Sequence, residues 1–311
     1  MKKIFKFVKQ NIIGFIIGGI VFGSLGVYAA GVIASKEITY EDNTSIGATN
    51  VQDAIDKLNT KATTKIAEAK KECPDGYICT KPSFKDDSWS TIARTVKAGK
   101  ASAYLVGDTK TVDMGELGTH TVRVANISSC TNGETSQTAC GFVVEFADIV
   151  SKQSMNSTST NVGGWSASAM RTYVNGTIYN ALPNELQNVI TETTVVSSHG
   201  KTSGEDNFTS SDKLYLLSTK EVWGKDGTSN TISNDTAEVE TRQLDYYKNK
   251  GVTTSNYSGA IKQYNGTNSY WWLRSAHSNS TSYFFIVSDS GGWSSRNAYI
   301  TIGVAPAFRI A

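Results

Sequence analysis

The chain has three histidines that could act as a general base near neutral pH: His120, His199 and His277. Serine or cysteine catalysis needs such a base in reach of the nucleophile. None of the three lies in a Gly-x-Ser-x-Gly segment or beside a cysteine. The sequence therefore favours a protein without nucleophilic catalysis.

Motifs that bind metals or nucleotides are also absent. The chain has no His-Glu-x-x-His pair, no EF-hand loop, no phosphate-binding glycine loop and neither signature of calcium-dependent sugar binding, Glu-Pro-Asn or Trp-Asn-Asp. We therefore expect no metal and no cofactor. Glu205, Asp206 and Asp226 lie in polar loops, and a pair of such carboxylates keeps a cell-wall or glycan hydrolase open as an alternative.

The four cysteines form two closely spaced pairs. Cys73 and Cys79 flank a Pro-Asp-Gly turn, and Cys130 and Cys140 flank a polar loop. Each pair can close as a local disulfide in an oxidising compartment. Four free thiols and a zinc site are the alternatives, and zinc is disfavoured because no Cys-x-x-Cys occurs.

Candidate recognition residues gather near the C-terminus. Residues 276–302 are rich in Ser, Asn, Thr and Tyr, a composition typical of adaptable binding surfaces. Trp293 follows Gly291-Gly292 and is expected at a loop tip, whereas Trp271 and Trp272 point to opposite faces of a strand. Aromatic rings would supply contact area, and Arg and Asn would supply hydrogen bonds. The predicted ligand-binding residues are Tyr283, Phe285, Trp293, Arg296, Asn297 and Tyr299.

The N-terminal residues indicate in which cellular compartment the protein lies. Four lysines precede residue 11, and no charged residue occurs from 11 to 35. About 20 apolar residues span a bilayer, and basic residues before the span stay on the cytoplasmic side. We expect 1–35 to be a signal anchor that crosses the cell membrane once through 11–34. The alternative is a cleaved signal peptide that ends near Ala29, which would make the protein secreted.

The charge of the remaining chain excludes one class of partner. The four N-terminal lysines are part of 30 basic residues, which leaves 26 against 28 acidic ones, or a net charge of −2. Nucleic-acid binding needs a basic footprint. We therefore expect no nucleic-acid partner.

Residues 36–82 read as a stalk. Val51, Ile55, Leu58 and Ala62 form one stripe of a helix expected over 48–72. The helix is either a spacer or a means of homo-oligomerisation. Its Thr-Asn-Val-Gln-Asp-Ala-Ile-Asp segment resembles stalk segments of phage fibres and of surface proteins of Gram-positive bacteria.

Residues 83–311 are expected to form one α+β domain. The patterns predict helices near 88–99, 165–174 and 182–190, with Ser166 as a cap, and strands over 212–218 and 141–150. The strand patterns of the last 42 residues predict an antiparallel sheet at the C-terminus.

Four motifs in this domain resemble those of an extracytoplasmic family, the domain of unknown function numbered 6273. Their order and spacing match over roughly 85–311, although Ala276 and Ala305 stand where the family often has proline and arginine. The motif residues are Trp165 to Arg171 (Trp-Ser-Ala-Ser-Ala-Met-Arg), Tyr215 to Ser218 (Tyr-Leu-Leu-Ser), Trp271 to Ser275 (Trp-Trp-Leu-Arg-Ser) and Gly303 to Phe308 (Gly-Val-Ala-Pro-Ala-Phe).

The C-terminal Ala307-Phe308-Arg309-Ile310 is also similar to the last strand of C-type-lectin-like domains, including the variable proteins of diversity-generating retroelements. By fold-level analogy this implies a C-type-lectin-like domain that displays side chains between two fixed strands. Related formylglycine-generating enzymes need cysteines near this end, and none follows Cys140.

Together these patterns predict a membrane-anchored cell-surface protein that binds an extracellular glycan, peptide or protein and is not an enzyme. A structural or assembly protein of the surface is the second hypothesis, and the hydrolase is the third.

Overall fold

The computed structural model describes residues 50–69, 82–131, 133–201, 206–224 and 234–311, with the backbone alone over 61–69. The chain divides into two units, residues 1–77 and 78–311. Within the described ranges, no helix is long and apolar enough to cross a membrane. The predicted membrane span over 11–34 and the predicted Cys73–Cys79 disulfide lie outside these ranges.

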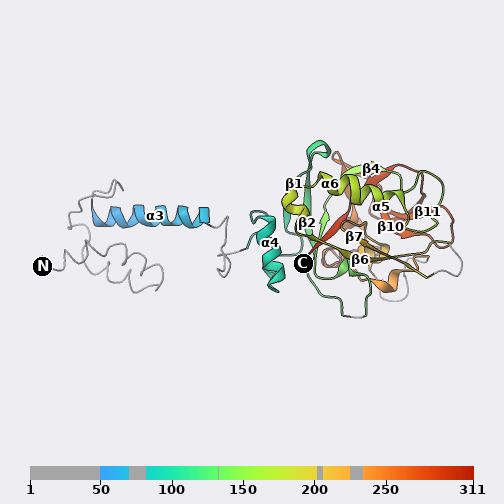
Figure 1. Ribbon diagram of the computed structural model, residues 1–311, viewed down its shortest axis with the longest axis horizontal. Coiled ribbons are helices and arrows are strands. Elements are labelled where there is room, and N and C mark those ends of the chain that lie inside the picture. The colour runs from blue at the N-terminus through green and yellow to red at the C-terminus, as the bar shows by residue number, and fades with distance from the viewer. Residues whose placement is uncertain (1–49, 70–81, 132, 202–205, 225–233) are drawn as a thin grey trace. The chain divides into compact units, whose positions relative to one another are not determined.

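The first unit contains helix α3, Val51–Ala69, as the stripe of apolar residues predicts (Figure 1). The Asn50 side chain accepts a hydrogen bond from the backbone N–H of Asp53, which caps the first turn. Ala54 is buried, and Ile55 and Leu58 are half-buried. Self-association through this helix stays a prediction.

The second unit is a mixed helix and strand domain, as expected. Its helices are short. They are α4 Trp89–Lys97, α5 Ala169–Tyr173, α6 Tyr179–Ala181, α7 Asn184–Gln187, α8 Thr219–Trp223 and α9 Asp245–Asn249, with a π-helical segment η5 Val174–Ile178 and 3-10 turns η2 Ala101–Ala103, η3 Gly115–Leu117, η4 Gln137–Ala139, η6 Glu238–Glu240 and η7 Ser258–Ala260.

Two five-stranded sheets carry the domain. The first has the order β1-β2-β3-β14-β5, and the second has the order β12-β11-β10-β13-β4. Two-stranded ribbons β6-β7 and β8-β9 complete the strands. Their bounds are β1 Thr109–Asp113, β2 Thr119–Asn126, β3 Phe142–Phe146, β4 Ser151–Gln153, β5 Ile190–Thr191, β6 Thr193–Ser197, β7 Phe208–Asp212, β8 Lys262–Tyr264, β9 Thr267–Ser269, β10 Trp271–Ala276, β11 Tyr283–Val287, β12 Trp293–Asn297, β13 Ile302–Val304 and β14 Ala307–Ile310.

The C-terminal residues do not form one antiparallel sheet, which corrects that expectation. β10 pairs with β11 antiparallel but with β13 parallel. After β13 the chain passes Ala305 and Pro306 and enters the first sheet, where β14 lies between β3 and β5. Proline lacks a backbone N–H, so it suits the point where one ladder ends and another begins.

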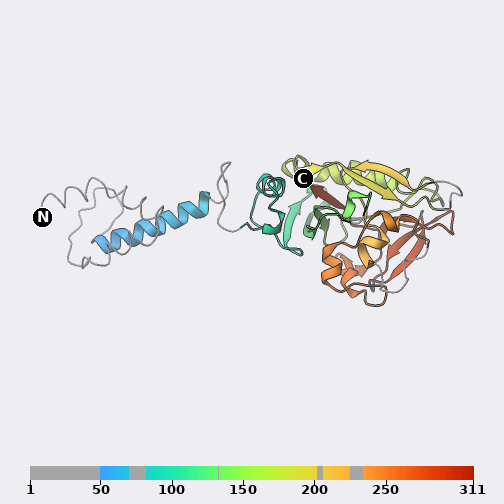
Figure 2. The ribbon, with the colours of Figure 1, turned by 90° about the horizontal axis from the view of Figure 1, so that it is seen from below.

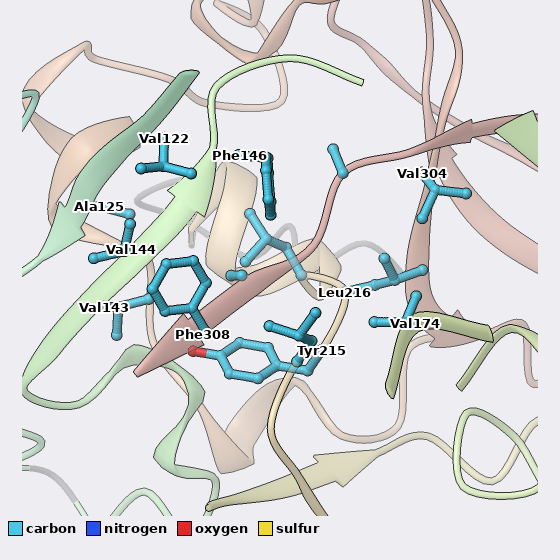
Figure 3. Packing of buried hydrophobic residues seen from close by; sticks show 14 of the residues in the cluster. Val122, Ala125, Val143, Val144, Phe146, Val174, Tyr215, Leu216, Val304 and Phe308 are labelled. Carbon is cyan, nitrogen blue, oxygen red and sulfur yellow. The ribbon is translucent and has the colours of Figure 1, made fainter. Parts of the chain in front are cut away.

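The core is continuous between the two sheets. Figure 3 shows Phe308 of β14 beside Tyr215, with Val143 and Val144 on one side and Leu216 and Val304 on the other. All of these side chains are completely buried.

Two local expectations need correction. Helix α5 begins at Ala169, not near Trp165, because the Ser168 hydroxyl rather than Ser166 accepts from the N–H of Arg171. Residues 213–218 form no strand; the backbone there makes a single bridge, between Tyr215 and Ala307.

Gly303 of β13 lies at a close approach within the second sheet, where β13 pairs with β10. A Cβ at this position would lie 2.7 Å from the Tyr270 carbonyl oxygen and 2.6 Å from Ile149 Cδ1. We expect Gly303→Ala to lower the free energy of unfolding by about 1–3 kcal/mol, the usual cost of overpacking. Chemical denaturation measures this.

Gly176→Ala is the matched control, because a Cβ at Gly176 has nothing within 4 Å and neither glycine has a positive φ. Equal stability of the two variants would contradict the close approach of β13 to Tyr270.

Candidate functional site

The β11-β12 hairpin carries most of the predicted ligand-binding residues. Its register pairs Tyr283 with Asn297, Phe285 with Ser295 and Val287 with Trp293. Opposed residues share one face of a sheet. We call the face formed by Tyr283, Phe285, Trp293, Ser295 and Asn297 the Trp293 face. Figures 1 and 2 show the hairpin's sheet at the end of the domain away from α4.

Three rings form a row across this face. The imidazole of His277, which follows β10, stacks on Phe285 with ring centroids 5.0 Å apart and an interplanar angle of 19°. Phe285 in turn lies 6.5 Å from Trp293. Burial lowers the pKa of His277 below 6.5, so this imidazole is neutral at pH 7. Phe285 is completely buried, which corrects its prediction as a ligand contact; it packs beside Trp293 on the same face.

Arg296 lies apart from the other candidates. It pairs with Phe284, so its side chain is on the opposite face, where the guanidinium lies 5.2 Å from the centre of the Tyr270 ring. The same guanidinium donates to the Ser294 hydroxyl and, over 2.9 Å, to the Ser295 carbonyl oxygen.

The remaining candidates are exposed or half-exposed. Trp293 is 49% exposed, and it is the first residue of β12 rather than a loop tip. Asn297 donates from its amide to the Ser159 hydroxyl over 2.7 Å. Tyr283 is exposed at the start of β11, and Tyr299 is exposed in the turn after β12.

Exposed large apolar side chains gather around this hairpin. Of the seven such side chains among the described residues, five lie on or near it, and Leu105 and Val239 do not. Tyr283, Trp293 and Tyr299 belong to the hairpin segment, and Tyr257 lies beside Gly292. Val162 follows Asn161, whose N–H donates to the Thr281 carbonyl. The sequence analysis did not single out His277, Val162 and Tyr257 as site residues. All three lie in loops, and the contacts of a loop residue with distant segments do not show as periodicity in the sequence.

Several buried charged side chains of the domain form ion pairs. Arg274 of β10 donates twice to Glu221 of α8, over 2.6 Å each, and both are buried. Thr138 and Thr241 also donate to Glu221. Burial alone would raise the pKa of Glu221, but the Arg274 guanidinium outweighs it and holds the pKa below 4.5. Glu221 is therefore an ionised structural carboxylate and not a general acid.

Cys130 and Cys140 form the predicted disulfide, which closes the loop that carries Thr138. The Thr138 backbone carbonyl also accepts from the Tyr215 hydroxyl over 2.9 Å. The disulfide thus limits the motion of a segment that completes the hydrogen bonding of Glu221 and Tyr215.

A second buried carboxylate, Glu145 of β3, accepts from Arg123 over 2.8 Å, from Lys262 over 2.9 Å and from the Tyr247 hydroxyl over 2.8 Å. Burial opposes its ionisation, but Arg123 and Lys262 lower its pKa below 4.5. Burial lowers the pKa of Lys262 to about 8. This group joins β2, β3 and β8.

A third carboxylate, Asp212, ends β7. It accepts from the Trp165 indole over 2.9 Å and from Arg171 Nε over 2.6 Å. It therefore ties the segment before α5 and α5 itself to the β6-β7 ribbon.

One surface cleft bears on the hydrolase hypothesis. A cleft of about 480 Å³ is lined by Asp206 and Glu240 together with Asn207, Thr135 and Thr209. Thr135 donates to Glu240. Glu205 and Asp226 lie outside the described residues. Where the structure describes the chain, no three His, Cys, Asp or Glu side chains come together as metal ligands.

The family described as "Domain of unknown function (DUF6273)" matches residues 143–311, which is more than half of the chain. The chain belongs to this family. No curated protein and no solved structure matches it. The C-type-lectin-like fold therefore stays a prediction.

The geometry explains what the DUF6273 motifs do here. Trp165 and Arg171 of the first motif hold Asp212, and Arg274 of the third holds Glu221. Gly303 of the fourth allows β13 to approach Tyr270. These motif residues are positioning residues, and the exposed residues of the Trp293 face lie outside the motifs.

The matched segment begins at β3, yet β1 and β2 pair into the same sheet before it. Arg123 of β2 also neutralises Glu145 of β3. The preceding residues, from α4 onward, thus complete the first sheet and its core.

Replacing Glu221 tests the buried pair. We expect Glu221→Gln to lower the free energy of unfolding by about 3–5 kcal/mol, because it leaves the buried Arg274 cation without a counter-charge. Glu192→Gln is the matched control. Glu192 is largely exposed and 3.6 Å from Lys213, so its loss costs about 0–1 kcal/mol. Denaturation that affects both variants alike would contradict a structural role for the pair.

Acid stability gives a second test. The folded-state pKa values of Glu145 and Glu221 lie below the ordinary 4.5. Their stabilising contribution is therefore complete above pH 4.5 and is lost as pH falls through the folded-state values. We expect the denaturation midpoint to fall on acidification below pH 4.5, and to fall less steeply in Glu221→Gln. A midpoint independent of pH between 3 and 5 would refute this assignment.

Proposed function

We propose that this protein is a single-pass membrane protein of a bacterial cell surface whose outer domain recognises an extracellular ligand through the Trp293 face. The observation that carries the proposal is the exposure of two aromatic side chains, Tyr283 and Trp293, on one face of a hairpin beside the buried Phe285. Exposed apolar surface on a soluble domain marks interaction sites. The uncharged stretch over 11–35 supports the membrane anchor.

The chemistry of the domain also supports recognition over catalysis. Buried Glu145 and Glu221 are ionised and saturated with donors, so neither is poised to transfer a proton. The Trp293 face instead offers aromatic area and neutral hydrogen-bonding groups, the combination that rigid binding surfaces use.

Two alternative functions are each supported by a specific structural feature. A hydrolase would use Asp206 and Glu240, which line one cleft. An assembly protein would use the half-buried apolar stripe of α3. Loss of a hydrolytic activity in Asp206→Asn, or oligomers that dissociate in Leu58→Asp, would favour these functions respectively.

Trp293→Ala tests the proposed function. The full chain, purified in a detergent without a sugar headgroup, is screened against immobilised glycans, peptides and surface proteins. We expect saturable binding that falls at least tenfold in Trp293→Ala while the melting temperature stays unchanged, because half of this side chain is already in water.

Leu105→Ala is the matched control. Leu105 is 67% exposed but follows η2 in a different part of the domain, so binding should be unaffected. No binding to any probe would contradict recognition, and unfolding of Trp293→Ala would make Trp293 a core residue.

A further inference from the structure

We infer that the ligand of the Trp293 face is an uncharged saccharide, with a sugar ring stacked on the Trp293 indole. This inference rests on the proposed function and narrows it to one class of ligand.

The charge on the hairpin is the first reason. Residues 276–302 contain one acidic and one basic residue, Asp289 and Arg296. Asp289 lies in the turn between the strands, and Arg296 is on the opposite face with Tyr270. The Trp293 face itself carries no charged residue. It therefore offers no counter-charge to an acidic or basic ligand, and a neutral ligand loses no ionic hydration on it.

The second reason is the support of the indole. The Phe285 ring lies beside Trp293 on the same face, 6.5 Å away and tilted by 59°, and the His277 ring stacks on Phe285. A half-exposed indole that packs laterally against a buried ring presents apolar surface at a small entropic cost. The C–H-rich face of a sugar ring is flat, apolar and complementary in shape to such a surface.

The third reason is the supply of neutral hydrogen-bonding groups along this face, with Ser295 near Trp293 and Tyr283 at the far end of the hairpin. In the described part of the chain, the Trp293 indole N–H, the Ser295 hydroxyl and the Tyr283 hydroxyl have no hydrogen-bond partner. The Asn297 amide, at the far end of the strand, already donates to the Ser159 hydroxyl. Trp293 and Asn297 are about 13 Å apart along an extended strand, which suits a short oligosaccharide.

The edge of the sheet argues against an added peptide strand. The N–H of Ser288 donates to the Gly292 carbonyl, and the N–H of Ala298 donates to the Ser282 carbonyl. Alternation along the ladder then turns the carbonyls of Ser295 and Asn297 away from β11.

Both of these outward carbonyls are already used. Arg296 donates to the Ser295 carbonyl, and the N–H of Ile300 donates to the Asn297 carbonyl. An added peptide strand needs such carbonyls for part of its hydrogen bonding, so their use by Arg296 and Ile300 weakens this edge as a peptide site.

The six tryptophans provide a direct readout. Trp89, Trp165, Trp223, Trp271 and Trp272 are at most 2% exposed, so Trp293 is the tryptophan that a soluble quencher reaches. A saccharide stacked on Trp293 must therefore protect the fluorescence of the full chain from acrylamide. A ligand bound elsewhere leaves the quenching unchanged.

The experiment titrates the full chain with neutral oligosaccharides of hexose and N-acetylhexosamine units, with acidic oligosaccharides, and with peptides, each with and without chelator. We expect a neutral oligosaccharide to bind and to suppress acrylamide quenching, independent of chelator and of salt. Affinity should fall at least tenfold in Trp293→Ala and less in Trp293→Phe, which keeps a ring. Arg296→Gln, on the opposite face, should stay within twofold of the parent chain.

The remaining outcomes separate the two proposals. Binding of only acidic oligosaccharides or peptides, lost in Trp293→Ala, would overturn the neutral saccharide and keep the recognition face. Saccharide binding that leaves quenching unchanged would overturn the stacking. No binding to any probe would overturn both proposals.

Discussion

The ion pair between Arg274 and Glu221 is the contact on which the arrangement of this domain depends. It joins the central strand of the second sheet, β10, to the first residues of α8, and Thr138 brings the disulfide-closed loop to the same carboxylate. Removing both charges from water is costly, and the bidentate geometry with its added hydroxyl donors offsets that cost. An alternative packing would leave a buried charge unpaired, so we regard the pair as a device that selects one arrangement.

The other buried carboxylates extend the same constraint to the rest of the domain. Glu145 joins β2, β3 and β8, and Asp212 joins α5 to the β6-β7 ribbon. The helices are short and charged residues make up only 19% of the chain, so few other helix contacts or ion pairs hold the long loops in one conformation. Paired charges do so with directional bonds, which apolar contacts alone do not provide.

The consequence for the proposed function is a buried frame beneath a small exposed surface. β10 and β11 are almost wholly buried, and β12 lies at the edge of their sheet. The family motifs hold the frame, whereas the exposed rings of the hairpin belong to none of them. A binding surface on such a frame can change its side chains without changing the fold, because the residues that determine stability lie beneath it.

The amino-acid sequence by itself determined what depends on local patterns. These include helix α3, the Cys130–Cys140 disulfide and membership of DUF6273. Only the tertiary structure decided which faces those residues occupy. The register separates Arg296 from Trp293, Phe285 turns inward beneath His277, and β14 leaves the sheet of its neighbours. The physical reason is that hydrophobic periodicity in the sequence indicates which side of a single helix or strand is buried. It does not indicate which distant segments pair with each other, because that depends on ion pairs and hydrogen bonds between residues far apart in the chain.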